Sequence, residues 1–366
     1  MLKKVAVFFS LMTAFSFQSF GQAGVTAVPF LQIAPDSRSS GFGEGGVAMS
    51  GRDPNTIFWN PAALYRVEEI MVAITHANWL PQLTGDLFYD YLAVTYPLGE
   101  DLGTLGMHVT YLNLGENVRT SETNQELGRF FSWEGAVGIS YGFPINEDWS
   151  FGTGARFIYS RLSPVPTAGE RGEGIASGFG VDLATEWHPK NLMIDAIGMD
   201  FSNKVRLGVS LSNIGPKMTY IDEDQADPLP TNFRAGVAYR WFDDEYYSLE
   251  TFAEFSKLMV AKKDSVTSYP VYQAVYKAWY KDGVGEELKK ANYTIGGEFV
   301  YDKFVFLRMG YFHEDEKYGN RKFMTYGVGL VYSFLNFDFS YISAFEEAHP
   351  LEGTVRVSLG LNVDRL

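Results

Sequence analysis

The stretch SRSSGFGEGGVAMSGRDPNTIFWNPAAL, residues 37–64, is the part of the chain around which the rest is organised. It is rich in glycine and turn-forming residues and has no sustained helical or strand period. An irregular segment of this composition can be ordered only if walls surround it. Because the chain downstream reads as amphipathic strands, we predict that residues 23–68 form a plug in a barrel built from residues 69–366.

The glycines of this stretch permit close backbone approach or a positive φ, and its Asn-Pro step favours a turn. The residues of this plug motif are Gly41, Gly43, Gly46, Asn60, Pro61 and Ala62. Three of them, Gly41, Gly43 and Gly46, also match the G-x-G-x-x-G pattern of dinucleotide sites. The flanking strand, helix and acidic residue that such a site requires are absent from the pattern, so we expect no cofactor.

Alternation of apolar and polar residues dominates the chain after residue 68, most clearly in TVRVSLGLNV, residues 354–363. Val209 and Leu359 belong to faces that we predict to meet lipid. The alternation predicts an all-β, 14-stranded antiparallel transmembrane barrel, since bacterial barrels of this type have an even strand count. The predicted strands are 69–79, 86–97, 103–115, 131–143, 149–162, 177–188, 205–214, 231–241, 248–258, 292–300, 305–313, 322–333, 337–343 and 354–363.

The predicted connections alternate between short and long. This asymmetry predicts short turns and both termini on the periplasmic side and long loops outside the cell. The connection 189–204 is longer than this rule allows and has no explanation in the sequence. The predicted lumen collects charges of both signs, which we expect to form paired networks with each other, with water and with backbone groups of the plug. They are Arg156, Arg206, Arg234, Arg240, Arg308 and Arg356 with Glu134, Asp182, Glu186, Glu250, Glu254, Glu298 and Asp338. Two interpretations stay open: these charges hold the plug to the wall, or they line a polar path for a solute.

Residues 1–22 combine Lys3 and Lys4 with an apolar run and small residues, which is the pattern of a secretory signal peptide. The 366 residues include no cysteine, which removes disulfides and thiol chemistry. Aromatic residues make up 16% of the chain, and its mean hydropathy is −0.10, as expected for strands with one lipid face. The net charge of −14 argues against a nucleic-acid partner. We expect an integral outer-membrane barrel in contact with lipid.

Two further patterns suggest chemistry, but their context does not support it. Ser140 lies in a G-x-S-x-G sequence within a predicted strand, not at the strand-to-helix turn that a hydrolase nucleophile needs. The five histidines are widely separated, and the acidic run Asp222, Glu223, Asp224 and Asp227 lacks the spacing of a calcium loop. We therefore expect no catalytic residues and no metal site, and hence no enzyme.

The predicted outer loop 259–290 contains an aromatic stripe at helical spacing. The stripe consists of Tyr272, Val275, Tyr276 and Trp279, with Pro270 placed to begin the helix and Gly283 to end it. Two interpretations stay open: the stripe packs on the rim of the barrel, or it binds a protein partner through exposed aromatic rings.

The strings IAPDSRSSGFGEGGVA, residues 33–48, and NTIFWNPAAL, residues 55–64, resemble the start of the PorV family of the type IX secretion system. That family is itself similar to FadL-type barrels. The resemblance implies an outer-membrane component that binds secreted cargo through a C-terminal signal domain. It also implies partners, namely an SprA-type translocon and a PorU-type sortase that attaches the cargo. The alternative is a FadL-type transporter of hydrophobic small molecules.

Overall fold

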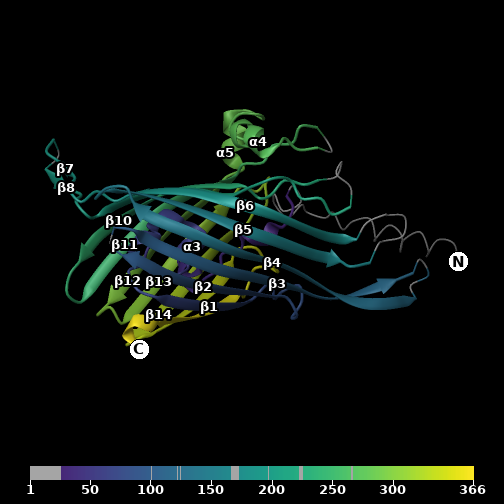
Figure 1. The fold of residues 1–366 in the computed structure, drawn as a ribbon, viewed down its shortest axis with the longest axis horizontal. Coiled ribbons are helices and arrows are strands. Elements are labelled where there is room, and N and C mark those ends of the chain that lie inside the picture. Colours follow the sequence, from purple (N-terminus) through teal and green to yellow (C-terminus); the bar gives the residue numbers. More distant parts are fainter. Residues whose placement is uncertain are drawn as a thin grey trace.

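Fourteen antiparallel strands close into one barrel in the computed structural model, which describes residues 26–99, 101–121, 123, 125–165, 173–196, 198–221, 226–264 and 267–366 (Figure 1). The barrel closes where β1 pairs with both β2 and β16. The predicted fold class is confirmed. The barrel strands are β1 Met71–Asn78, β2 Phe88–Gly99, β3 Gly103–Thr120, β4 Glu126–Pro144, β5 Trp149–Ser163, β6 Gly174–Trp187, β9 Val205–Ile214, β10 Asn232–Asp243, β11 Tyr247–Leu258, β12 Asn292–Tyr301, β13 Val305–Glu314, β14 Lys322–Tyr332, β15 Leu335–Ala344 and β16 Val355–Asn362.

The two ends of the barrel differ in the length of their connections. The short-turn end holds the connections β2–β3, β4–β5, β10–β11, β12–β13 and β14–β15, whose described residues are 101–102, 145–148, 244–246, 302–304 and 333–334. The C-terminal 3-10 helix η5, Val363–Arg365, lies at the same end. The other end, called the long-loop end, carries the long connections, including the helices α4 Val271–Lys277 and α5 Val284–Lys289. None of the helices in the described residues has the length and apolarity needed to cross a membrane.

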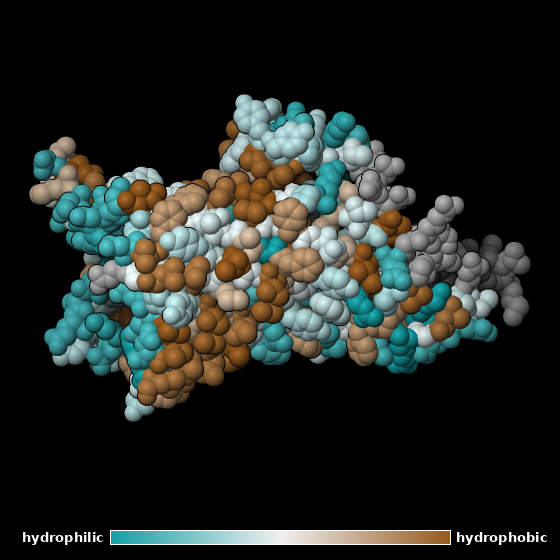
Figure 2. Space-filling model, viewed as in Figure 1, coloured by the Kyte–Doolittle hydropathy of each residue, from teal (hydrophilic) through white to brown (hydrophobic). Residues whose placement is uncertain are grey.

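Each strand separates an outward apolar face from an inward polar one. Val209 and Leu359 are exposed on the outer wall, whereas Arg206 and Arg356 on the same strands are buried in the lumen. Figure 2 shows the resulting hydrophobic band on the outside of the barrel. The predicted register is therefore confirmed for these strands, because a shift of one residue would place the arginines outside.

Two rows of outward aromatic side chains border this band. The row toward the long-loop end includes Phe88, Tyr111, Trp133, Tyr159, Phe233, Phe255 and Tyr293, and the row toward the short-turn end includes Tyr141, Trp149, Trp187, Tyr239, Trp241, Tyr247 and Tyr301. Along β4 the rows are eight positions apart, from Trp133 to Tyr141. At about 3.3 Å per residue this spans roughly 26 Å of strand. Because the strands of such barrels tilt by about 35–45°, the rows lie roughly 20 Å apart along the barrel axis, comparable to the apolar band of about 25 Å in transmembrane barrels.

The long connection 189–204 folds into a small hairpin of β7, Met193–Ile194, and β8, Met199–Asp200. Figure 1 shows it projecting from the short-turn end. Its base is tied to the β4–β5 turn, where Asp148 accepts hydrogen bonds from the backbone nitrogens of His188 (2.8 Å) and Lys190 (2.7 Å). The additional residues therefore form a short hairpin. Its strands have two residues each, which is too few for an alternating pattern to be recognised in the sequence.

We expect the base of this hairpin to lose stability in acid. Burial, with the nearby Arg66 charge, lowers the pKa of His188 from 6.5 to about 4. Between these two values the unfolded segment binds more protons than the folded one, so stability falls as the pH falls through this window. Lower protection factors of the Leu192 and Asn203 amides in acid, taken relative to the intrinsic exchange rate at each pH, would show the effect. His188→Gln should abolish the pH dependence, and an unchanged dependence in this variant would contradict the assignment.

The N-terminal segment fills the lumen. It forms the short helices η2 Pro29–Gln32, α2 Ser37–Gly41, α3 Thr56–Trp59 and η3 Pro61–Arg66, and most of its side chains between residues 26 and 64 are buried. Asp36 accepts a hydrogen bond from the backbone nitrogen of Ser39 (2.7 Å) and thereby caps α2. Because so few helical turns are present, the segment depends on the surrounding wall for its order.

The path of this segment bears on one prediction. Phe30 and Leu31 pack in a cluster with Leu112 and Ala136, which belong to the long-loop halves of β3 and β4. From there the chain crosses the lumen and enters β1 at Met71, which pairs with Asn362 at the short-turn end. The route differs from the expected placement of both termini at one end, because the described chain begins at Thr26 at the long-loop end, while residues 1–25 lie outside the described residues. Alternation in the strands carries no information about the route of an irregular segment inside them.

Candidate functional site

A buried carboxylate on the wall holds the N-terminal segment in place. Glu298 of β12 receives both Nε (3.1 Å) and Nη2 (3.3 Å) of Arg38. The same carboxylate receives Arg52 Nη1 at 2.9 Å and Arg308 Nε at 2.7 Å. Three guanidinium groups thus share one side chain that is 1% exposed. Two of them belong to the segment and one to the wall, so the site ties the two together.

Further contacts repeat this pattern around the lumen. Glu250 pairs with Arg52 of the segment (3.1 Å) and with Arg206 of the wall. Glu254 accepts the backbone nitrogens of Gly46 (2.7 Å) and Val47 (2.8 Å). Two further ion pairs between segment and wall are Arg66 with Glu186 at 2.9 Å and Glu44 with Arg356 at 2.7 Å. The sequence predicted the wall charges and their contacts with the segment backbone, which Glu254 makes, but missed the charged side chains of the segment as partners, although Arg38, Glu44 and Arg52 are visible in the stretch 37–64.

The predicted plug-motif residues act on backbone geometry. Asn60 accepts the Ala62 nitrogen (3.1 Å) and so caps η3, while its Nδ2 donates to Val47 O (2.8 Å). Pro61 is the first residue of η3, a position where its missing N–H costs nothing. The glycines of the motif meet two kinds of requirement. Gly41 lies against the backbone of Gly327 and Gly46 against the Trp59 ring, whereas Gly43 has a φ of +110°.

Glycines in the wall allow the N-terminal segment to approach the strands closely. A methyl group at Gly152 of β5 would lie 2.2 Å from the Ala62 nitrogen. We expect Gly152→Val to displace η3 at a cost of about 1–3 kcal/mol. Limited proteolysis of the folded barrel should then cleave the segment faster. Gly85→Val, at a glycine with no atom within 4 Å of the added carbon, is the control. Equal cleavage in both variants would refute the contact.

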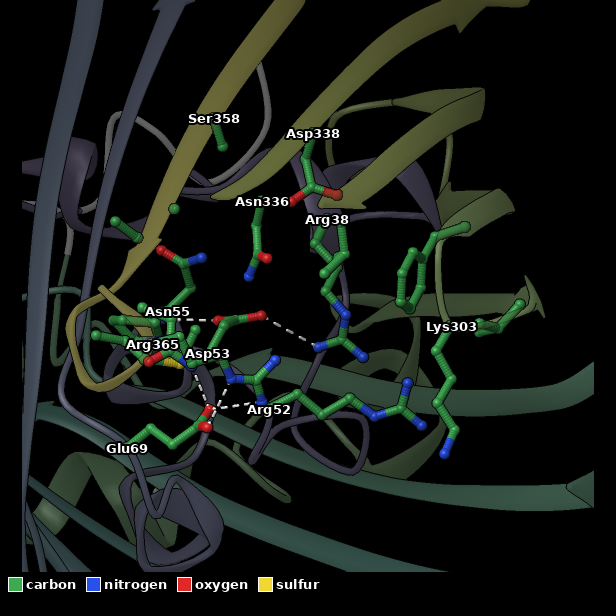
Figure 3. Close-up of a pocket in the computed structure, with 18 of the residues that line it drawn as sticks. Arg38, Arg52, Asp53, Asn55, Glu69, Lys303, Asn336, Asp338, Ser358 and Arg365 are labelled. Carbon is green, nitrogen blue, oxygen red and sulfur yellow. Dashed lines mark hydrogen bonds and ion pairs between the residues drawn. The ribbon is translucent and has the colours of Figure 1, made fainter. Parts of the chain in front are cut away.

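A polar cavity of about 370 Å³ lies below the segment at the short-turn end (Figure 3). Arg38, Asp53 and Arg52 of the segment point into it, and Asp338 and Arg365 enter from the wall and the C-terminal helix. Burial raises the pKa of Asp53, although Arg38 Nη1 lies 3.6 Å from its carboxylate. The cavity contains ion pairs throughout, so its charges largely balance one another.

A second, apolar cavity of about 710 Å³ opens at the long-loop end, on the other side of the segment. Its lining includes Phe30, Ile33, Trp79, Leu112, Leu162 and Leu351. Glu134 also borders it and accepts a hydrogen bond from Ser160 Oγ (2.8 Å). Because the two cavities lie on opposite sides of the N-terminal segment, an extended solute path would require that segment to move.

The predicted stripe in the long loop divides into two sets. Tyr272 and Tyr276 are exposed, whereas Trp279 packs on the outer-wall rings of Phe233 (5.3 Å) and Phe255 (6.2 Å). Val275 is half-buried. Pro270 lies at the N-cap of α4, but the helix ends at Lys277, and Gly283 begins α5 instead of ending α4. The loop thus combines rim packing with an exposed aromatic face, and its role in partner binding stays a prediction.

The other singled-out residues lie apart. Ser140 is buried in β4 and faces the lumen. His108 is buried beside the Tyr91 ring, at 5.8 Å. Among the described residues, no group of three or more His, Cys, Asp or Glu side chains is arranged to hold a metal ion. Asp222, Glu223 and Asp224 lie outside the described residues, as does the predicted signal peptide, and Asp227 forms a backbone bridge with Met218.

A closed barrel with an apolar outer band, two aromatic borders and a lumen filled by its own N-terminal segment defines an outer-membrane β-barrel. Within that class the chain belongs to the PorV family, since the family model described as type IX secretion system protein PorV matches residues 18–265. No curated protein matches the chain.

Solved structures agree on the fold. The Ralstonia pickettii toluene transporter TbuX is similar at a TM-score of 0.53 with 12% identity, covering 90% of this chain and 98% of that one. A deltaS2 mutant of the TodX monoaromatic hydrocarbon channel is similar at 0.53 with 10% identity, covering 90% and 97%. At such low identity these likenesses describe a FadL-like fold and nothing about ligands.

Proposed function

We propose that this protein is the outer-membrane subunit that receives secreted cargo at the type IX translocon and carries it to the attachment complex. Its partners on this proposal are an SprA-type translocon, the C-terminal signal domains of cargo, and a PorU-type sortase. The protein binds and delivers cargo, and it carries out no chemical step itself. The observation that carries the proposal is membership of the PorV family combined with a lumen closed by the N-terminal segment.

The closed lumen supports a binding role over conduction. Arg38 and Arg52 link the segment to Glu298, and Glu254 holds the backbone at Gly46 and Val47. Removing such a segment would uncover buried charges, which is costly. A conducting pore would need that removal in each cycle, whereas a cargo carrier can act through its outer surfaces with the segment in place.

The orientation belongs to the same proposal. Long loops of bacterial barrels face the cell exterior and short turns face the periplasm. In that orientation the apolar cavity of about 710 Å³ opens outside, where translocated cargo emerges. A FadL-type transporter of hydrophobic solutes would also use such a cavity. The family match favours secretion over that alternative.

Native extraction of the tagged protein in mild detergent tests the proposal. We expect mass spectrometry to identify a translocon protein and cargo that retains its C-terminal signal domain. Cells that produce cargo without this domain are the control, and in them the cargo should be lost from the extract while the translocon protein stays. Recovery of the barrel with a bound hydrophobic solute, and with neither protein, would contradict the proposal.

A further inference from the structure

An exposed apolar row runs along the helical excursion α4–α5. The side chains recur every fourth position and are between 43% and 75% exposed: Tyr272, Tyr276, Tyr280, Val284 and Leu288. Tyr276 and Tyr280 contact each other edge to face at 5.4 Å. The row spans two short helices joined by the turn 278–283, and Tyr276 and Tyr280 are the pair whose contact links α4 to that turn. Several exposed apolar side chains on one short excursion are informative, because single exposed apolar residues are common but clustered ones mark a contact surface.

The opposite face of the excursion is fixed to the outside of the barrel. Ala274 and Ala278 are buried, and the Trp279 ring lies nearly parallel to that of Phe255, at an angle of 12°. Lys257 points outward from β11 and pairs with Glu287 of α5 at 3.0 Å, both side chains being almost fully covered. The row of five residues is therefore held at a defined place and points away from the wall.

That place is the lipid-facing side. Phe233 and Phe255, on which Trp279 packs, belong to the aromatic row that borders the apolar band. Figures 1 and 2 show α4 and α5 standing out sideways from the barrel, beside the hydrophobic band and not over its open mouth. The surface they present is continuous with the surface that meets the bilayer, so whatever surrounds the barrel at this height also touches the row.

The composition of the excursion suits the boundary between lipid headgroups and acyl chains. Tyrosine and tryptophan prefer that boundary because their rings are apolar and their polar atoms stay hydrated. Between residues 259 and 291 there are six lysines and four acidic residues, a net charge of +2 in a chain of net charge −14. Local positive charge favours a surface that carries phosphate.

We propose that α4–α5 is an interfacial foot, whose row from Tyr272 to Leu288 rests in the headgroup region of the lipid leaflet at the long-loop end. The inference is independent of the secretion role, since lipid alone supplies the contact. An amphipathic element of this kind lies in the plane of the membrane surface and binds through its apolar face. Here the barrel holds it at the required height.

Spin labelling tests the foot directly, because the chain has no cysteine of its own. A nitroxide is attached to Tyr276→Cys in the full-length protein, reconstituted in vesicles of phosphatidylethanolamine and phosphatidylglycerol. The measured quantity is the ratio of collision rates with oxygen, which concentrates in lipid, and with a water-soluble nickel complex. Leu359→Cys on the outer wall is the lipid control, and Glu316→Cys in the β13–β14 loop is the water control.

We expect the ratio at Tyr276→Cys to exceed that at Glu316→Cys several-fold and to approach that at Leu359→Cys. Tyr272→Cys should give the same result, which guards against a local effect of one substitution. A ratio equal to the water control at both positions, in barrels that still migrate as folded, would overturn the proposal. The row would then return to the interpretation as a protein-binding surface.

Discussion

Glu298→Ala is expected to destabilise the barrel by about 3–5 kcal/mol, the cost of leaving buried charges without their partner. The substitution removes one carboxylate but strands Arg38, Arg52 and Arg308, which all lie within 3.3 Å of it. Asp338, Glu250 and Asp53 would still pair with Arg308, Arg52 and Arg38, but the Arg38–Asp53 distance of 3.6 Å is the longest of the three, so the loss falls most heavily on Arg38. Urea unfolding of the protein in lipid vesicles gives the free energy.

Glu316→Ala is the matched control, because Glu316 also forms an ion pair with a basic side chain, Lys322 at 2.7 Å, but in solvent. Exposed pairs of this kind contribute only about 0–1 kcal/mol. Equal destabilisation by the two substitutions would mean that the Glu298 network does not hold the N-terminal segment. A large effect at Glu298 together with faster proteolysis of that segment is the result that this arrangement predicts.

Leu359→Arg is expected to cost about 2–4 kcal/mol when the protein inserts into a bilayer, since it places a guanidinium on the lipid face near the middle of β16. Leu359 is 51% exposed on the outer wall, and its neighbours Ser358 and Gly360 face the lumen. Leu359→Met preserves an apolar side chain of similar size and should fold normally. Insertion efficiency of both variants into vesicles is the measurement.

A substitution on the lumen face cannot serve as the control for Leu359→Arg. Ser358 Oγ accepts the Ser37 backbone nitrogen at 3.0 Å, so an arginine at position 358 would collide with the N-terminal segment. A loss of insertion in the Ser358→Arg variant would therefore give no information about which face of β16 meets lipid. Normal insertion of Leu359→Arg would contradict the face assignment, whatever position 358 does.

The barrel could be predicted because its strands obey a local rule. Polar residues that face the lumen alternate with apolar residues that face lipid. The sequence around Val209 and Leu359 therefore predicts which way these side chains point. The lumen charges followed from the same register, since Arg206 and Glu250 could face only inward. The predicted strands 322–333 and 337–343 leave residues 334–336 for the β14–β15 turn, whereas β14 ends at Tyr332 and β15 begins at Leu335, because the strand residues on either side continue the alternation.

The remaining features depend on contacts between distant residues. Ala274 and Ala278 form the packing face of α4, because small side chains let a helix approach the wall closely. The sequence pattern instead indicated the aromatic residues, which lie on the opposite and flanking sides of the helix. The 3-10 helix η2 at the long-loop end could not be predicted either, since its position depends on a hydrophobic cluster with Leu112 and Ala136 far along the chain.

On the proposed function the protein acts with its N-terminal segment in place, and a reversible disulfide between segment and wall tests whether it does. Ser37 Oγ lies 2.9 Å from Ser358 Oγ, so the double variant Ser37→Cys, Ser358→Cys places two thiols where a disulfide can form between segment and wall. The single variants control for each substitution. Cells that carry the oxidised double variant are predicted to secrete and attach cargo as well as the single variants do. Loss of secretion on oxidation, restored by a reductant, would show that the segment must leave the lumen and would contradict the account.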